Sequence, residues 1–518
     1  MGSLRCILIL SISFFGLCQT VVSQEFERVL WGPMLDEQRG NEVLHTFATA
    51  TKDFIVIREN KRKREGLIIE RIGGDSLNLV LSKPLILPNL ENSIAAYYEP
   101  LTLGGKTYLV ATADDPNGLN VFIIAFELLE SLDVAPRPIV LGIGSRPALI
   151  NKNGFTLRAD SVNNVLALLI PMEFQDGKNE KFELRAFDSD LKLRYEKKLE
   201  VPHSSENLVY AGLVVDSLNA IFVLTGLADP AIDTRNGRRN LGRDFSLFKY
   251  NWATEELKEK SLSLGTKWLY DVKMFRNAAN NIQIAGYYSN MIDLVMAGTF
   301  SLELNRFDSQ VINQGISPFG RDFRAMLRPL NAGGSDTELG MFYIDNAYQM
   351  DGGSAMIVSE KSYTSTTTIF NPATGTYSVV NIFNFDEVLV TSMTAKSKID
   401  FAIMVPKYQS SVRGPGSYTS YRSFRRGDKT YIVFNDHERN TSLSINDTKG
   451  IRPLNSASSA VPALISIDAT GEMKRVATLS DGVAQPILDC RYLVEASDGV
   501  IFMATIGSRT QYLKLCFE

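Results

Sequence analysis

The sequence has few of the residues that most often carry catalysis or bind metals. Only three of its 518 residues are histidines, namely His45, His203 and His437, and they lie far apart in the chain. Histidine is the side chain that most often acts as an acid, a base or a metal ligand near neutral pH. His437 has two acidic neighbours, Asp436 and Glu438. Adjacent residues of a strand point to opposite faces, so this run is more typical of a strand end or turn than of a catalytic triad.

Motifs for nucleophilic catalysis and calcium binding are also missing. The segment Gly142–Arg146 (GIGSR) lacks the final glycine of the Gly-x-Ser-x-Gly motif, and Gly414–Tyr418 (GPGSY) does not fit it either. The spaced carboxylates of a calcium loop do not occur, and Asp188 with Asp190 is more typical of a β-turn. We therefore expect no catalytic residue, no metal site and no cofactor, and the sequence favours a non-enzymatic protein.

Cysteine is rare as well. Of four cysteines, two fall near the N-terminus and the others are Cys490 and Cys516. If the C-terminal segment forms a three-stranded meander, these two lie on its first and third strands, roughly 10 Å apart. A disulfide needs Cα atoms nearer than about 7 Å. The sequence therefore predicts two free, buried thiols.

The chain also lacks a long hydrophobic run and a strong net charge. No stretch reaches the roughly 18 consecutive apolar residues of a membrane helix, whereas the run Cys6–Leu17 has the length of a signal-peptide core. Small residues before Gln24 predict cleavage there. The formal charge of -4 argues against a nucleic-acid partner, because such binders carry a basic face. We predict a signal peptide over residues 1–23 and an exported chain over 24–518 without a membrane span.

What the sequence has in abundance is short runs of β-branched and aromatic residues, separated by turn formers such as Asn117-Gly118. The clearest unit starts at Leu208 and contains four successive strand-like runs, and the next repeats this order. Four-stranded units repeated along a chain are the sequence pattern of a β-propeller. Comparable units begin near His45, Ser93, Pro147, Leu208, Trp268, Gly340, Tyr421 and Pro486.

The last unit, from Pro486, has only three predicted strands, and the segment Phe26–Leu35 (FERVLWGPML) could supply the fourth. We therefore predict an all-β fold: a single propeller of four-stranded antiparallel blades, closed into a ring by the N-terminal strand. The predicted number of blades is eight, with seven as the alternative if one unit is divided wrongly. A row of β-sandwich domains would show similar strand spacing, but the sequence contains no linker to separate them.

Two pairs of tyrosines are candidate ligand contacts. Tyr97 with Tyr98, and Tyr287 with Tyr288, stand at the ends of predicted strands. Ligands of propellers commonly meet loops at one end of the central channel, where tyrosines stack on sugars or anchor a partner. The four tyrosines are therefore predicted to lie at the channel mouth.

The most unusual stretch is Ser362–Tyr377 (SYTSTTTIFNPATGTY), which extends the sixth unit. Its β-branched hydroxyl residues favour a long hairpin arm, and projecting segments on rigid scaffolds often carry partner contacts. A second polar stretch, Tyr408–Arg426, is expected to belong to the same surface. The predicted partner contacts are Tyr363, Thr364, Thr366, Thr367, Thr368, Arg422, Arg425 and Arg426.

From about Gly340 onward, the sequence resembles an uncharacterised family of exported, propeller-like proteins of similar length from Bacteroidetes. The matching segments are DGGSAMIVSEKSYTSTTT, VPKYQSS, KTYIVFNDHERN and PALISIDATGEM. The resemblance implies a cell-envelope protein, located in the periplasm or peripherally associated with the outer membrane at the cell surface. It brings no active site to carry over.

Two functions are compatible with these observations. The first is a non-enzymatic scaffold or accessory protein that binds another envelope protein through loops on a propeller face. The alternative is a carbohydrate-binding or carbohydrate-active propeller. A glycosidase of this kind would need two carboxylates about 5.5 Å or about 6.5 to 9.5 Å apart at the channel mouth.

Overall fold

The structure is a computed structural model of the 518-residue chain. The predicted signal peptide, residues 1–23, lies outside the residues that it describes. The described residues are 28–36, 41–49, 52–60, 66–90, 93–160, 162–173, 177–216, 220–227, 242–290, 296–321, 323, 342–350, 353–371, 375–412, 414, 416, 418–445, 450–478 and 486–517.

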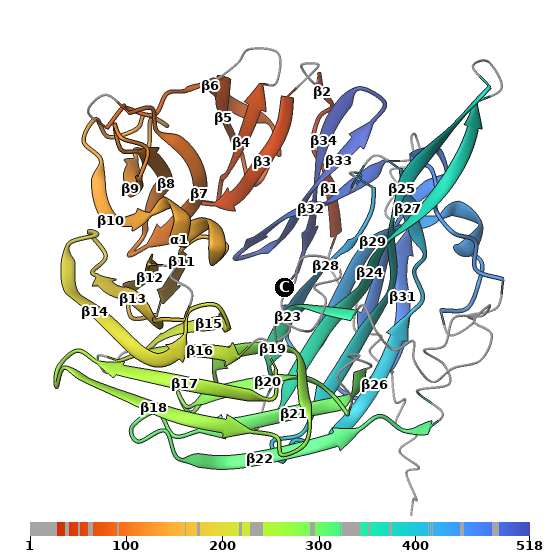
Figure 1. Ribbon diagram of the computed structural model, residues 1–518. Coiled ribbons are helices and arrows are strands. Elements are labelled where there is room, and N and C mark those ends of the chain that lie inside the picture. Colours follow the sequence, from red (N-terminus) through yellow and green to blue (C-terminus); the bar gives the residue numbers. More distant parts are fainter. Residues whose placement is uncertain are drawn as a thin grey trace, which may run out of the picture.

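Eight antiparallel sheets are arranged around a common centre, as Figure 1 shows. Each sheet has four main strands, and two of the sheets gain one further short strand. The innermost strands of most neighbouring sheets contact one another around the ring. The predicted eight-bladed β-propeller is therefore confirmed.

Blades 1 to 4 follow one another along the chain, each with its first strand innermost. Blade 1 contains β3 (Asn41–Ala48), β4 (Phe54–Asn60), β5 (Gly66–Ile72) and β6 (Leu79–Leu85), and blade 2 contains β7 (Ala96–Leu103), β8 (Lys106–Asp114), β9 (Asn120–Leu128) and β10 (Ile139–Ser145). Blade 3 contains β11 (Thr156–Asp160), β12 (Val165–Glu173), β13 (Asn179–Phe187) and β14 (Leu193–Ser204), and blade 4 contains β15 (Leu208–Asp216), β16 (Ala220–Leu227), β17 (Asp244–Asn251) and β18 (Glu256–Ser263).

Blades 5 to 8 complete the ring. Blade 5 contains β19 (Trp268–Arg276), β20 (Ile282–Ser289), β21 (Met296–Leu304) and β22 (Val311–Pro318), and blade 6 contains β23 (Phe342–Gln349), β24 (Ala355–Asn371), β25 (Thr376–Met393), β26 (Ile399–Val405) and the short β27 (Gln409–Ser411). Blade 7 contains β28 (Tyr421–Arg426), β29 (Lys429–His437), β30 (Ala460–Ile467) and β31 (Met473–Thr478). Blade 8 contains β32 (Ile487–Ala496), β33 (Gly499–Ile506), β34 (Arg509–Cys516), β1 (Arg28–Trp31) and the short β2 (Leu35–Asp36).

The ring closes through the N-terminal segment, as predicted. Strand β1 pairs antiparallel with β34, from Arg28 opposite Cys516 to Trp31 opposite Leu513. Val29 and Trp31 pack into the core between blades 7 and 8, whereas Leu30 packs towards blade 1. Alternate residues of a strand point to opposite faces, so the apolar run of β1 suits an element that is buried on both sides.

The middle strands of the blades are apolar on both faces because each blade is packed between two neighbours. Every residue of β20 is buried. Ile282 and Ile284 face the core shared with blade 4, and Ala285 and Tyr287 face the core shared with blade 6. Continuous apolar runs are typical of strands that bury both faces.

Helical structure is scarce among the described residues. The helix α1 (Arg146–Asn151) precedes blade 3, and the short 3-10 turns are Glu438–Asn440 and Ala457–Ser459. The predicted start of the third unit at Pro147 was wrong by several residues, because Pro147 lies in the first turn of α1 and the blade begins at Thr156. Proline suits the first turn of a helix, where its missing N–H has no partner to lose.

Cys490 and Cys516 are buried and free, which confirms the prediction from strand spacing. They lie on β32 and β34, with β33 between them. Burial raises the pKa of the Cys490 thiol to about 12, so this thiol is an inert core residue.

Candidate interaction arm

Blade 6 extends into the hairpin that the threonine-rich stretch predicted. Strands β24 and β25 contain 17 and 18 residues, and they pair from Ala355 opposite Met393 to Asn371 opposite Thr376. Strand β23 covers β24 only as far as Lys361. Beyond that point the hairpin projects from the ring (Figure 1), and ten residues of strand reach roughly 30 Å. We call Ser362–Phe385 the arm.

The register gives the arm two faces of different character. On one face, which we call the tip face, Thr366 lies opposite Asn381, Thr368 opposite Val379, and Phe370 opposite Tyr377. Thr364 precedes Thr366 on the same face, because residues two apart in a strand share a face.

Large apolar side chains are exposed on the tip face. Tyr377 and Val379 are each 73% exposed and Phe370 is 49% exposed. The rings of Phe370 and Tyr377 lie against each other with their centroids 5.0 Å apart. Ile369, on the other face, is 48% exposed. These four residues are absent from the sequence-predicted contacts, although all four are apolar or aromatic residues close to the predicted turn.

The predicted contacts Tyr363 and Thr367 lie on the face opposite to the tip face. Thr367 is exposed, but Tyr363 is half-buried and hydrogen-bonded to Asp386. Burial and the nearby carboxylates raise the pKa of the Tyr363 phenol. Tyr363 therefore belongs to the attachment of the arm.

The arm is attached through a bulge. The ladder shifts between Glu360 and Ser362, so that Lys361 on β24 lies across from both Asp386 and Glu387 on β25. All four of these charged side chains are at most 9% exposed. A β-bulge bends its strand and increases its twist, which is consistent with the change from a packed blade to a projecting hairpin at this point.

The buried charges at the bulge are compensated by partners on other segments. The Lys407 ammonium forms an ion pair with Glu360 at 2.8 Å and donates to the Phe385 carbonyl at 2.7 Å. The Tyr408 hydroxyl donates to Glu387 at 3.0 Å, and Ser420 donates to the other oxygen of Glu360 at 2.9 Å. Buried charges persist when they are paired and hydrogen-bonded, so we regard this group as structural. We call Glu360, Lys361, Asp386, Glu387, Lys407 and Tyr408 the arm base.

One carboxyl of the arm base titrates unusually. Burial, together with the adjacent Glu387 carboxylate, raises the pKa of Asp386 from 3.8 to about 6. Lys361 and Lys407 oppose this rise only in part. The protonation of Asp386 therefore changes in a mildly acidic range.

The three arginines predicted to share this surface have a different role. Arg422, Arg425 and Arg426 lie on β28, the innermost strand of blade 7. Arg425 donates to the Gln349 carbonyl of blade 6 at 2.7 Å, and Arg426 donates to the Ala496 carbonyl of blade 8 at 2.9 Å. Arg422 likewise donates to a carbonyl of β32. These guanidinium groups join neighbouring blades, and a partner contact at the three arginines stays a prediction.

The four channel-mouth tyrosines fall into two environments. Tyr287 and Tyr288 are buried on β20, and the Tyr287 hydroxyl forms a hydrogen bond with Ser359 at 2.9 Å. These two tyrosines are core residues, and placing them at the channel mouth was an error. Tyr97 and Tyr98 lie on the innermost strand β7, where Tyr98 is 44% exposed at a bulge. A carbohydrate contact at Tyr98 stays a prediction.

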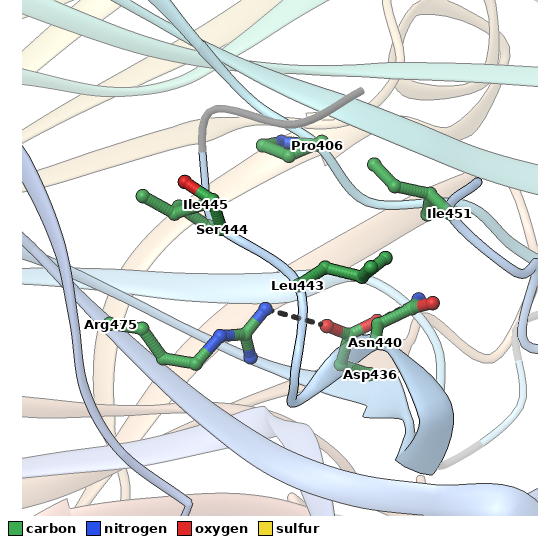
Figure 2. Close-up of a pocket in the computed structure, with 8 residues that line it drawn as sticks. All are labelled: Pro406, Asp436, Asn440, Leu443, Ser444, Ile445, Ile451 and Arg475. Carbon is green, nitrogen blue, oxygen red and sulfur yellow. Dashed lines mark hydrogen bonds and ion pairs between the residues drawn. The ribbon is translucent and has the colours of Figure 1, made fainter. Parts of the chain in front are cut away.

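A small pocket lies beside blade 7, and Figure 2 shows the residues that line it. Arg475 and Asn440 donate to the two oxygens of Asp436 at 3.0 and 2.7 Å. The pocket has room for about one water molecule. His437 lies at the strand end, as predicted, and accepts a hydrogen bond from the Arg439 amide. Within the described part of the chain, no group of three acidic, histidine or cysteine residues is placed to hold a metal.

The chain matches no protein-family model and no curated protein. Similar solved structures include the β-propeller domain of the Trilobed protease from Pyrococcus furiosus, with 8% identity, a TM-score of 0.36, and coverage of 86% of this chain and 98% of that one. The WD40 domain of SCAP from fission yeast has 10% identity and a TM-score of 0.35, and the match covers 94% of this chain and 98% of that domain. Quinohemoprotein alcohol dehydrogenase from Comamonas testosteroni has 11% identity and a TM-score of 0.39, and the match covers 94% of this chain and 76% of that one.

These likenesses concern the fold alone. The three proteins differ in what they do, and similarity this distant carries no argument about activity. Within the described residues, no helix has the length and apolarity that a membrane crossing requires.

Proposed function

We propose that the protein is a non-enzymatic binding scaffold of the cell envelope, in which the propeller holds the arm out towards another envelope protein. The observation that carries this proposal is the exposed tip face with Phe370, Tyr377 and Val379. Exposed apolar groups on a projecting element are typical of contact sites, and aromatic anchors often dominate binding energy.

The stability of the arm also favours a partner. Near the tip, Thr366 to Phe370 and Thr376 to Val379 are exposed on both faces of the ribbon. A two-stranded ribbon is marginally stable in water unless further strands or a packed face support it. Binding would therefore stabilise the arm while removing its apolar side chains from water.

Export and an envelope location are supported by the signal-peptide pattern of residues 1–23 and by the resemblance of the C-terminal part to envelope proteins. Both remain part of the proposal. Fractionation of the native host, with the N-terminus of the mature protein determined by mass spectrometry, tests them directly.

The function is tested by purifying the tagged protein from its native host in mild detergent and identifying bound proteins by mass spectrometry. The test variant carries Phe370→Ser, Tyr377→Ser and Val379→Thr. A matched control carries Ile86→Ser and Val162→Thr, which change exposed apolar residues outside the arm. One envelope protein at equal abundance, lost in the test variant and kept in the control, supports the proposal. Equal recovery from both variants contradicts it.

A further inference from the structure

We infer that two copies of this chain join edge to edge through β24, so that their arms form one four-stranded sheet. This inference rests on the proposed role of the arm as a contact element. It goes further by naming the first occupant of the arm as a second copy of the same protein.

The β24 edge is the longer free edge of the arm. Among the described residues, no strand pairs with β24 beyond Lys361 on the side away from β25. The edge of β25 is partly covered, because β27 pairs with Phe383 to Phe385. An uncovered strand presents a row of unpaired N–H and C=O groups, which is a template for another strand. On β24 this row extends from Ser362 to Asn371.

The lack of charge along the β24 edge favours a second copy of the same strand as its partner. No charged residue occurs from Ser362 to Phe385. In a dimer with two-fold symmetry, the edge residues of one copy lie opposite residues of the same run in the other copy, and the residue on the axis lies opposite its own counterpart. A charge on the axis would therefore face a like charge and destabilise the pair. An uncharged edge of serine and threonine avoids this cost. A partner selected by charge would instead need charges on the arm.

The symmetry also places the faces usefully. Antiparallel neighbours related by a two-fold axis perpendicular to the sheet keep the same face upward. With Thr366 on the axis, Thr364 lies opposite Thr368, and Ser365 lies opposite Thr367. Such hydroxyl pairs are favourable across strands. Both tip faces then lie on one side of the sheet, and four strands replace the marginal two-stranded ribbon.

The first test is the mass of the purified full-length protein in solution, measured by light scattering at micromolar concentration. We expect a dimer of the 57.5 kDa chain. Thr366→Lys with Thr368→Lys should give a monomer of unchanged circular dichroism, and mixing it with the Thr366→Glu, Thr368→Glu variant should restore a dimer. A control with the same added charge, Thr254→Lys with Thr266→Lys, changes exposed residues of blade 4 and its following turn and should stay dimeric.

Two outcomes would overturn the inference: a monomeric wild-type protein, or a dimer that survives the paired lysine substitutions. Neither outcome would by itself contradict the proposed function. A monomer that still captures an envelope protein through Phe370, Tyr377 and Val379 would leave that proposal standing.

A second test locates the edge. In a Cys6→Ser, Cys18→Ser background, single cysteines replace the residues from Thr364 to Thr368 one at a time, and mild oxidation follows. Only the residue on the two-fold axis has its own counterpart within the about 7 Å that a disulfide allows. We expect one sharp maximum of linked dimer within this run, and little linkage from Ser378→Cys on β25. A flat profile, or a maximum at Ser378, would contradict pairing through β24.

Discussion

The two halves of the β24–β25 hairpin share one continuous ladder but are stabilised differently. In the blade half, Met356, Ile357 and Val358 are fully buried and contact the cores on both sides. In the arm half, Thr366 and Thr368 are exposed and have cross-strand neighbours, and among the described residues no further layer covers them. The comparison shows that hydrogen bonding to the neighbouring strand is enough to extend a hairpin. Packing against other blades decides which part of the hairpin is buried and therefore inaccessible to a partner.

The largest expected effect comes from removing the buried charge at the boundary between the halves. Lys407→Ala leaves Glu360 buried without its 2.8 Å ion-pair partner. We expect a loss of about 3 to 5 kcal/mol in the free energy of unfolding, measured by urea titration. Adding Glu360→Gln should recover part of this loss. A single substitution without effect would show that the arm base does not stabilise the ring.

A pair of alanine substitutions compares the halves directly. Leu389 is fully buried in the blade half, whereas Val379 is 73% exposed in the arm. Leu389→Ala should cost about 2 to 5 kcal/mol, and Val379→Ala should stay within about 0.5 kcal/mol. Thermal or urea unfolding of both variants under conditions that keep the protein monomeric would measure the contrast. Equal losses would mean that the arm is packed against something in solution.

The third prediction concerns pH. Because the pKa of Asp386 rises from 3.8 to about 6 on folding, the folded state binds a proton more tightly than the unfolded state. The resulting stabilisation is complete below about pH 4 and is lost as pH rises through about 6, a change of roughly 3 kcal/mol at most. Asp386→Asn should flatten this part of the stability profile. Parallel profiles for wild type and variant would contradict the assignment.

The smallest expected effect concerns the aromatic pair near the turn. Phe370→Ala with Tyr377→Ala removes a contact with centroids 5.0 Å apart, which is worth about 0.5 to 1.5 kcal/mol beyond its buried area. Hydrogen exchange should become faster in Thr366 to Asn371 and remain unchanged in the blade half of β24. Faster exchange throughout the strand would argue against independent halves.

The sequence was sufficient to predict the ring because the blades repeat one order of apolar runs, with Leu208, Trp268 and Tyr421 each starting an innermost strand. It also indicated the arm, since β-branched residues without charge favour a long hairpin. The exposed side chains of the arm were harder to identify from the sequence, because the exposure of Phe370 and Tyr377 depends on which other strands pack against the arm.

The surroundings that the sequence did not predict have a common physical cause. Arg425 and Arg426 find their acceptors 76 and 70 residues away in the chain, on neighbouring blades. Tyr287 and Tyr288 are buried because β20 is the second strand of its blade and is covered on both faces. The local sequence pattern identifies a strand, but the contacts of its side chains depend on which blades become neighbours once the ring has closed.

The pairing of Arg28 with Cys516 ties the first described strand of the protein to the last. A chain is synthesised from its N-terminus, so β1 has no partner until β34 has been made. Closing the final blade therefore needs a contact between residues that are far apart in sequence, and such contacts form slowly. A chain that ends before β34 lacks the strand that pairs with β1 and cannot close the ring in this way.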